Sequence, residues 1–102
     1  MRTILITGAT SGIGEATARL LIKKNRLILC GRRNERLEKL KSELGLINEV
    51  TTLNFDVSNR KAVFESIESL PDNFKSIDVL INNAGNAHGL ATFQDADLDD
   101  LD

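Results

Sequence analysis

The chain has 102 residues, of which 41% are hydrophobic and 27% charged, a composition typical of one small globular domain. Its net charge of −2 and its 4% aromatic content provide no basic footprint or stacking platform, so we expect no nucleic-acid partner. The apolar runs are too short for a membrane span and no signal-peptide pattern is present, so we expect a cytoplasmic protein without membrane association. Cys30 is the only cysteine, which excludes an intramolecular disulfide and a cysteine-based metal cluster, and we expect its thiol in the core and no metal site.

Short apolar runs alternate with amphipathic segments along the chain, a pattern that predicts βαβ units. We expect strands over about residues 3–6, 26–30, 50–55 and 79–81. We expect helices over about residues 12–24, between a cap at Asn34 and Gly45, and between a cap at Ser58 and Pro71. Right-handed crossovers then give the strand order 3-2-1-4. The sequence therefore predicts an α/β fold, a Rossmann-type doubly wound parallel sheet with flanking helices that is truncated after its fourth strand.

The first two helices each contain a set of residues, mostly apolar, that recur at helical spacing. In the first helix they are Ile13, Thr17, Leu20 and Leu21, and in the second Leu37, Leu40 and Leu44. Asn25 is expected to take the left-handed position after the first helix. The charge run on the second helix is most simply a solvated surface; it comprises Glu35, Arg36, Glu38, Lys39 and Lys41.

A glycine-rich stretch, residues 7–14, lies where the first strand must turn into the first helix. Gly8 would permit a tight turn, Gly12 a close approach of backbone to a pyrophosphate, and Gly14 close packing of helix on strand. The helix N-terminus would add N–H donors and partial positive charge. Three glycines also fit a plain loop, and their spacing departs from the commoner fingerprint, but the flanking strand and helix favour a phosphate site. Its candidate residues are Gly8, Thr10, Ser11, Gly12, Ile13 and Gly14.

Arg32 and Arg33 follow the second strand, where an NAD-binding fold would carry an acidic residue for the ribose 2′-hydroxyl. A guanidinium offers charge-assisted hydrogen bonds to a 2′-phosphate, which a carboxylate would repel. The pair therefore favours NADP, although two arginines can also be ordinary surface charges.

Asp56 follows the third strand and has two interpretations. Its carboxylate can accept a hydrogen bond from the exocyclic amine of an adenine. It can equally cap the next turn as an Asx motif, and the two roles can coexist.

These motifs resemble the short-chain dehydrogenase/reductase family over nearly the whole chain: the Thr7–Gly14 pattern, Asp56-Val57 and Asn82-Asn83-Ala84-Gly85. Residues 31–37 and 77–85 are most similar to its NADP-dependent 3-hydroxy acid (serine or allo-threonine) dehydrogenase branch. The resemblance implies that Gly8 to Ile13 hold the pyrophosphate and that Arg32 and Arg33 hold the 2′-phosphate. It further implies that Asp56 and Val57 contact the adenine, and that Asn83, Ala84 and Gly85 line the adenosine side.

The family's catalytic residues, a Ser and a Tyr-x-x-x-Lys pair, lie downstream of the matched motifs, and this chain contains no tyrosine. We therefore expect one N-terminal dinucleotide-binding portion, residues 1–102, without catalytic residues or activity of its own. Three hypotheses remain: the NADP(H)-binding portion of an oxidoreductase acting on a small hydroxy or oxo acid, a stand-alone nucleotide-binding or regulatory module, and a structural subunit. An apolar edge at residues 79–81 predicts a homo-oligomer joined through this strand, or a poorly soluble chain. The acidic tail, residues 95–102, is either a first helical turn or a solvated end, and His88 is expected in an exposed loop.

Overall fold

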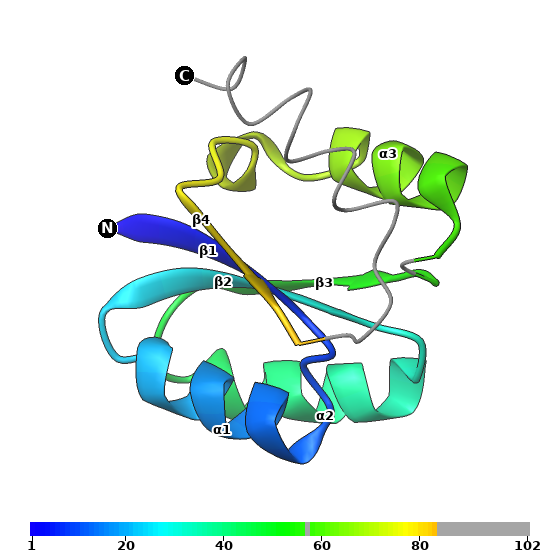
Figure 1. Ribbon diagram of the computed structural model, residues 1–102. Helices are drawn as coiled ribbons and strands as arrows, with labels where there is room; N and C mark the ends of the chain where they lie inside the picture. Colours follow the sequence, from blue (N-terminus) through cyan, green and yellow to red (C-terminus); the bar gives the residue numbers. More distant parts are fainter. Residues whose placement is uncertain (57, 84–102) are drawn as a thin grey trace.

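Within residues 1–56 and 58–83, which the structure describes, four parallel strands form one sheet in the order β3-β2-β1-β4. The structure, a computed structural model, has α1 and α2 on one face of this sheet and α3 on the other (Figure 1). The elements in chain order are β1 (Arg2–Thr7), α1 (Gly12–Leu21), β2 (Asn25–Gly31), α2 (Asn34–Leu44), β3 (Val50–Asn54), α3 (Arg60–Glu68), the 3-10 helix η1 (Asp72–Phe74) and β4 (Val79–Asn82). The predicted α/β class and strand order are confirmed, and each strand end lies within one residue of its expected position. No helix in the described residues is long and apolar enough to cross a membrane.

The continuous apolar run of β1 fills both layers of the core. Leu5 belongs to the cluster on the α3 side, while Ile4 and Ile6 belong to the cluster beneath α1 and α2. Successive side chains of a strand point to opposite faces, so a strand covered by helices on both faces must be apolar throughout. The apolar face predicted for the second helix is also confirmed, since α2 buries Leu37, Leu40 and Leu44.

Cys30 is fully buried on β2, in the cluster on the α3 side together with Ile28. Burial raises the pKa of its thiol well above the ordinary value, because a thiolate would lose its hydration there. The expectation of a core thiol is therefore confirmed.

The buried face of α1 differs from the apolar spacing that predicted this helix. Ile13 and Leu20 are 74% and 69% exposed, whereas Gly14, Ala18 and Ile22 face the sheet. These three residues follow one another at intervals of four, and the first two are small. Small residues allow the helix to lie close to the sheet, and Ile13 and Leu20 point outward while Leu21 packs against the core.

Two expectations for the end of α1 are wrong. The helix stops at Leu21, three residues earlier than predicted, and no non-glycine residue in the described part of the chain has a positive φ. Asn25 is instead the first residue of β2, and its side-chain amide donates to the carbonyl of Leu21 at 2.8 Å. The carbonyl at the helix end is thus satisfied by a side chain rather than by a left-handed turn.

Both predicted N-caps lie one residue away from the observed ones. Arg33 precedes α2 and makes no side-chain cap hydrogen bond, so Asn34 is the first helical residue instead of the cap. Asn59 caps α3 by accepting from the amide of Ala62 at 3.1 Å, in place of Ser58. Asparagine and serine are equally good N-caps, so the sequence alone could not show which of the two adjacent residues caps α3.

Candidate functional site

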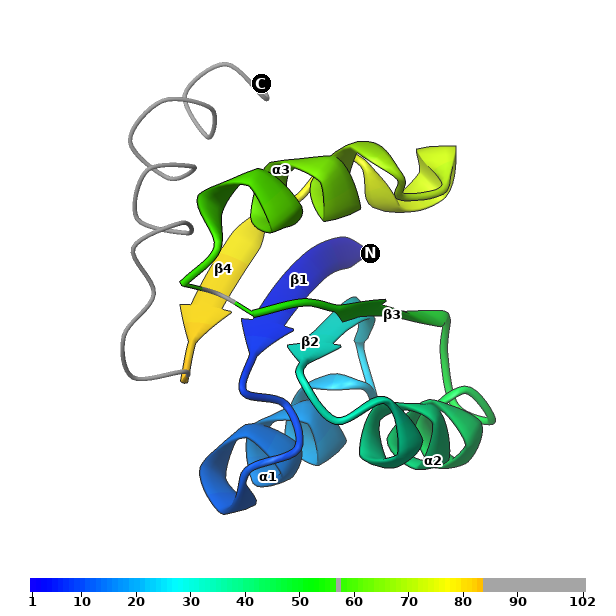
Figure 2. The same cartoon turned by 90° about the vertical axis from the view of Figure 1, so that its right-hand side faces the viewer.

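The carboxyl ends of the parallel strands place the predicted site at one edge of the sheet, where ligands of such folds bind. Figure 2 shows β1, β2 and β4 ending on the same side. Among the candidate residues, Val57, Ala84 and Gly85 lie outside the described residues.

The glycine turn after β1 is closed by short polar contacts. Gly8 has a φ of 60°, the left-handed conformation that glycine adopts readily. The Ser11 hydroxyl donates to the Gly8 carbonyl at 2.7 Å and accepts from the Gly14 amide at 3.1 Å, which caps α1. A Cβ on Gly14 would lie 2.0 Å from the Gly8 carbonyl oxygen. The fold itself therefore requires glycine at position 14 and favours it at position 8.

Gly12 and Ile13 differ from the other residues of the turn, because packing among the described residues does not explain why glycine and isoleucine occupy these positions. A Cβ on Gly12 would meet no atom within 4 Å, and Ile13 is 74% exposed. Both residues lie in the first turn of α1, where backbone amides are available to an anion. Their predicted contact with a pyrophosphate remains a prediction.

A threonine that sequence reasoning missed connects β1 to the end of β4. The Thr7 hydroxyl donates to the side-chain oxygen of Asn82 at 2.8 Å and accepts from the backbone amide of Asn83 at 3.0 Å. Thr7 is fully buried, so this contact fixes the two strand ends relative to each other. The available signal was a polar residue at the end of an otherwise apolar strand, directly before the glycine turn.

The side-chain nitrogen of Asn83 is buried and has no hydrogen-bond partner among the described residues. An unpaired buried donor costs free energy and calls for an explanation. An acceptor on a bound ligand or elsewhere in the protein would satisfy this donor, which agrees with the choice of Asn83 as a candidate residue.

Arg32 lies beside the carboxylate of Asp56, with 3.8 Å between its Nη1 and Oδ2 of Asp56. The same carboxylate accepts from the hydroxyl of Ser58 at 2.7 Å and from its amide at 2.9 Å. The Ser58 hydrogen bonds, and to a smaller degree the charge of Arg32, lower the pKa of Asp56. The Asx interpretation of Asp56 is thus confirmed, while its contact with an adenine remains a prediction.

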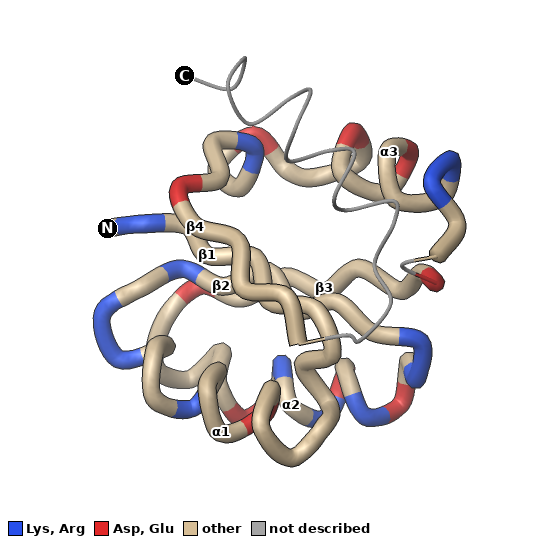
Figure 3. The backbone as a smooth tube through the Cα atoms, viewed as in Figure 1, with Lys and Arg blue, Asp and Glu red and all other residues tan. Residues whose placement is uncertain are grey.

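The β2–α2 junction carries the basic pair in an exposed position. Arg32 and Arg33 are both exposed, and Figure 3 shows basic positions where β2 leads into α2. The side chain of Arg33 is not used to cap α2. Both guanidinium groups are therefore accessible from solvent at the edge of the sheet where the glycine turn lies.

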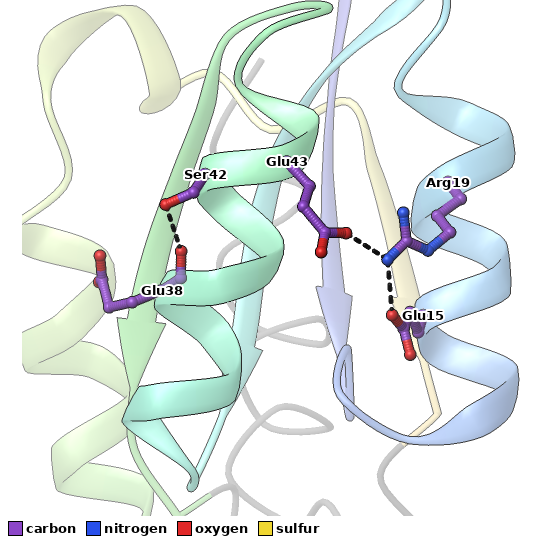
Figure 4. A network of polar contacts seen from close by, with 5 residues as sticks. All are labelled: Glu15, Arg19, Glu38, Ser42 and Glu43. Carbon is purple, nitrogen blue, oxygen red and sulfur yellow. Dashed lines mark hydrogen bonds and ion pairs between the residues drawn. The ribbon is translucent and has the colours of Figure 1, made fainter.

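A cleft of about 240 Å³ separates α1 from α2, and its presence could not be anticipated from the charge run on α2. Arg19 joins the two helices by pairing with Glu15 at 2.8 Å and with Glu43 (Figure 4). The cleft is lined by Thr10, Glu15, Arg19, Arg36, Lys39, Leu40 and Glu43. Arg36 and Lys39, interpreted from sequence as plain solvated charges, therefore line a concave surface that also includes the glycine turn.

The sequence model of the short chain dehydrogenase family matches residues 2–102. An NADP-dependent 3-hydroxy acid dehydrogenase of Salmonella typhi is 47% identical over 98 residues, which are 95% of this chain and 39% of that protein. A serine 3-dehydrogenase of Agrobacterium fabrum is 50% identical over 90 residues, covering 87% of this chain and 35% of the relative.

Solved structures agree with these relatives. Serine dehydrogenase from Escherichia coli has a TM-score of 0.77 at 45% identity, over 82% of this chain and 38% of that one. A closed form of serine dehydrogenase complexed with NADP⁺ has a TM-score of 0.76 at 45% identity, over 81% and 33%. The chain thus spans about two fifths of the length of the curated relatives it matches. On the match of residues 2–102, the chain belongs to the short chain dehydrogenase family.

Proposed function

We propose that residues 1–102 are the NADP(H)-binding N-terminal portion of an oxidoreductase that interconverts a hydroxyl and a carbonyl group by hydride transfer. The names of two similar proteins, a 3-hydroxy acid dehydrogenase and a serine 3-dehydrogenase, support a small 3-hydroxy or 3-oxo acid as the substrate. Because this chain spans only part of those proteins, the proposal concerns a protein of which the chain supplies the cofactor-binding side.

The observation that carries the proposal is the position of the glycine turn and the arginine pair at the ends of adjacent strands. β1 and β2 pair in parallel, with Ile6 opposite Leu29, so the turn after β1 lies beside the β2–α2 junction. In our proposal Gly8, Thr10, Ser11, Gly12, Ile13 and Gly14 hold the pyrophosphate, and Arg32 and Arg33 bind the 2′-phosphate. Asp56 and Val57 contact the adenine, and Asn83, Ala84 and Gly85 line the adenosine side.

The residues at this edge fit such a cofactor. The exposed first turn of α1 leaves open space at Gly12, and the buried Asn83 amide lacks an acceptor among the described residues. When bound, the nicotinamide would supply or accept the hydride. The role of this chain is to hold the adenosine and phosphate groups in a fixed orientation.

We further propose that the 102 residues bind the cofactor without turning it over, since the chain has no tyrosine to act as the family's proton donor. The alternative from another class is a nucleotide-binding or regulatory module without chemistry. The oxidoreductase proposal requires the chain to bind NADP(H), whereas the alternative requires only that it binds a nucleotide or serves a regulatory role.

Calorimetric titration of the chain with NADPH and with NADH tests the cofactor proposal. We expect clear preference for NADPH, and equal affinities would contradict the assigned 2′-phosphate site. A second assay mixes the chain with NADPH and a panel of 3-oxo acids. Turnover that scales with chain concentration and disappears on Arg32→Ala/Arg33→Ala substitution would show that the chemistry resides in these residues after all.

A further inference from the structure

The cleft between α1 and α2 is lined by Arg36, a cationic side chain that belongs neither to the arginine pair nor to the glycine turn. Arg36 lies in the first turn of α2, and its side chain lines the cleft together with Thr10 of the glycine turn. Thr10 in turn lies against the end of β2, because its hydroxyl oxygen is 3.7 Å from the position of a Cβ on Gly31. The cleft thus begins at the point where the glycine turn meets the β2–α2 junction.

The other cations of the cleft have carboxylates near them. Arg19 pairs with both Glu15 and Glu43, and the charge of Lys39 lowers the pKa of Glu43. In the described part of the chain, by contrast, no carboxylate lies within ion-pair distance of Arg36, which is exposed. Arg36 therefore keeps its full charge available to an anion in the mouth of the cleft.

Charge balance at the proposed 2′-phosphate supports a role for this cation. A ribose phosphate carries a charge of about −1.5 to −2 at pH 7. Arg32 is 3.8 Å from Asp56, so part of its charge is already offset by a carboxylate. Arg33 directly precedes α2, and Arg36 lies three residues later in its first turn. A phosphate bound by Arg33 at the start of α2 would therefore lie near Arg36, which lines the adjoining cleft.

We propose that Arg36 is a further specificity-determining residue, which binds the 2′-phosphate of NADP(H) from the α1–α2 cleft. The inference rests on the proposed function, and it adds a third guanidinium to the pair seen in the sequence.

The test compares adenosine 2′,5′-bisphosphate with adenosine 5′-monophosphate, using the 102-residue chain and calorimetry. We expect Arg36→Gln to weaken the affinity for the bisphosphate by about 10-fold or more and to change the affinity for the monophosphate by less than about 2-fold. Arg36→Lys should recover part of the loss, since it restores charge without the planar fork. Lys41→Gln, on the same helix and outside this cleft, should change neither affinity.

A pH series separates phosphate binding from a general structural effect. The second pKa of the phosphate is about 6, so the penalty of Arg36→Gln should shrink as the pH falls below that value. A structural effect of Arg36 would weaken both nucleotides equally and show no such dependence, which would overturn the inference.

The remaining outcomes distinguish the inference from the function on which it rests. If the unmodified chain prefers the bisphosphate and Arg36→Gln keeps that preference, the inference about Arg36 fails and the proposed function stands. If the unmodified chain shows no preference for the bisphosphate, the assigned 2′-phosphate site fails, and the inference fails with it.

Discussion

A methyl group on Gly14 would lie 2.0 Å from the carbonyl oxygen of Gly8, closer than non-bonded atoms approach. The backbone of α1 therefore packs directly on the turn that follows β1. The Ser11 hydroxyl stabilises this contact with hydrogen bonds to the Gly8 carbonyl and the Gly14 amide. This contact orients the first turn of α1, which is the part of the helix assigned to a pyrophosphate.

Gly14→Ala should therefore destabilise the chain by about 3 kcal/mol, the upper range for an overpacked site, because backbone atoms cannot move aside as a flexible side chain can. Gly12→Ala is the matched control: its Cβ meets nothing, so the unfolding free energy should change by less than about 1 kcal/mol. Urea unfolding of both variants measures the difference. Equal losses would show that the contact with Gly8 is not the constraint.

Thr7→Val should destabilise the chain by about 1–3 kcal/mol. The substitution keeps the shape of the side chain but removes the hydroxyl that accepts from the Asn83 amide and donates to Asn82. Thr52→Val serves as the control, since its hydroxyl donates to Glu38 in an exposed contact, and it should shift stability by less than about 0.5 kcal/mol. A similar small shift for Thr7→Val would mean that β4 is held without this contact.

Replacing Arg32 and Arg33 together with alanine should weaken NADPH binding by about 2–3 kcal/mol, because charge-assisted hydrogen bonds to the 2′-phosphate are lost. NADH lacks this phosphate, so its affinity should hardly change. Calorimetric titrations of the double variant with both cofactors provide the measurement. Parallel losses for the two cofactors would argue against 2′-phosphate recognition by this pair.

Asp56 should make stability depend on pH in the acid range. Its pKa is lowered in the folded chain, chiefly by the Ser58 hydrogen bonds, so its contribution is present above the unfolded pKa of about 3.9. The contribution is lost as the pH falls through the lower folded value. The difference in unfolding free energy between the unmodified chain and Asp56→Asn should therefore shrink from pH 7 to pH 3. A constant difference would exclude this linkage.

The chain should self-associate through β4, which pairs only with β1 among the described residues and lies at the edge of the sheet. Its residues Val79, Leu80 and Ile81 are only half-buried, in contrast to the fully buried centre of β1. An apolar edge with open backbone groups recruits another strand. Sedimentation over a concentration series should show an oligomer, and a monomer at every concentration would contradict the prediction.

The strand order could be predicted from the sequence because the prediction rests on local, repeating features. These are the apolar runs, the helical spacing and Gly45 at the end of α2. The sequence was less informative where two residues compete for one role. Asn59, and not Ser58, caps α3. Ala18, and not Leu20, lies on the buried face of α1, because small residues allow the helix to approach the sheet closely.

For the candidate site, the sequence identified residues that lie at strand ends and missed those that come together only through tertiary structure. Thr7 gains its role from Asn82, which is 75 residues away, and Arg36 lines a cleft whose other wall is α1. The sequence around Thr7 marks it only as a polar residue that ends an apolar run, and it does not reveal the partner at the end of β4.

The Cys30 thiol can report how often the core of this chain opens to solvent. Its thiol is the only one in the sequence, is fully buried in the central part of the sheet, and stays protonated because burial raises its pKa. Alkylation requires an accessible thiolate. The rate at which a thiol reagent labels the chain therefore measures how often β2 separates from the α3 layer, without any introduced probe. The same measurement, repeated with and without NADPH, would give the stabilisation that ligand binding confers on the core.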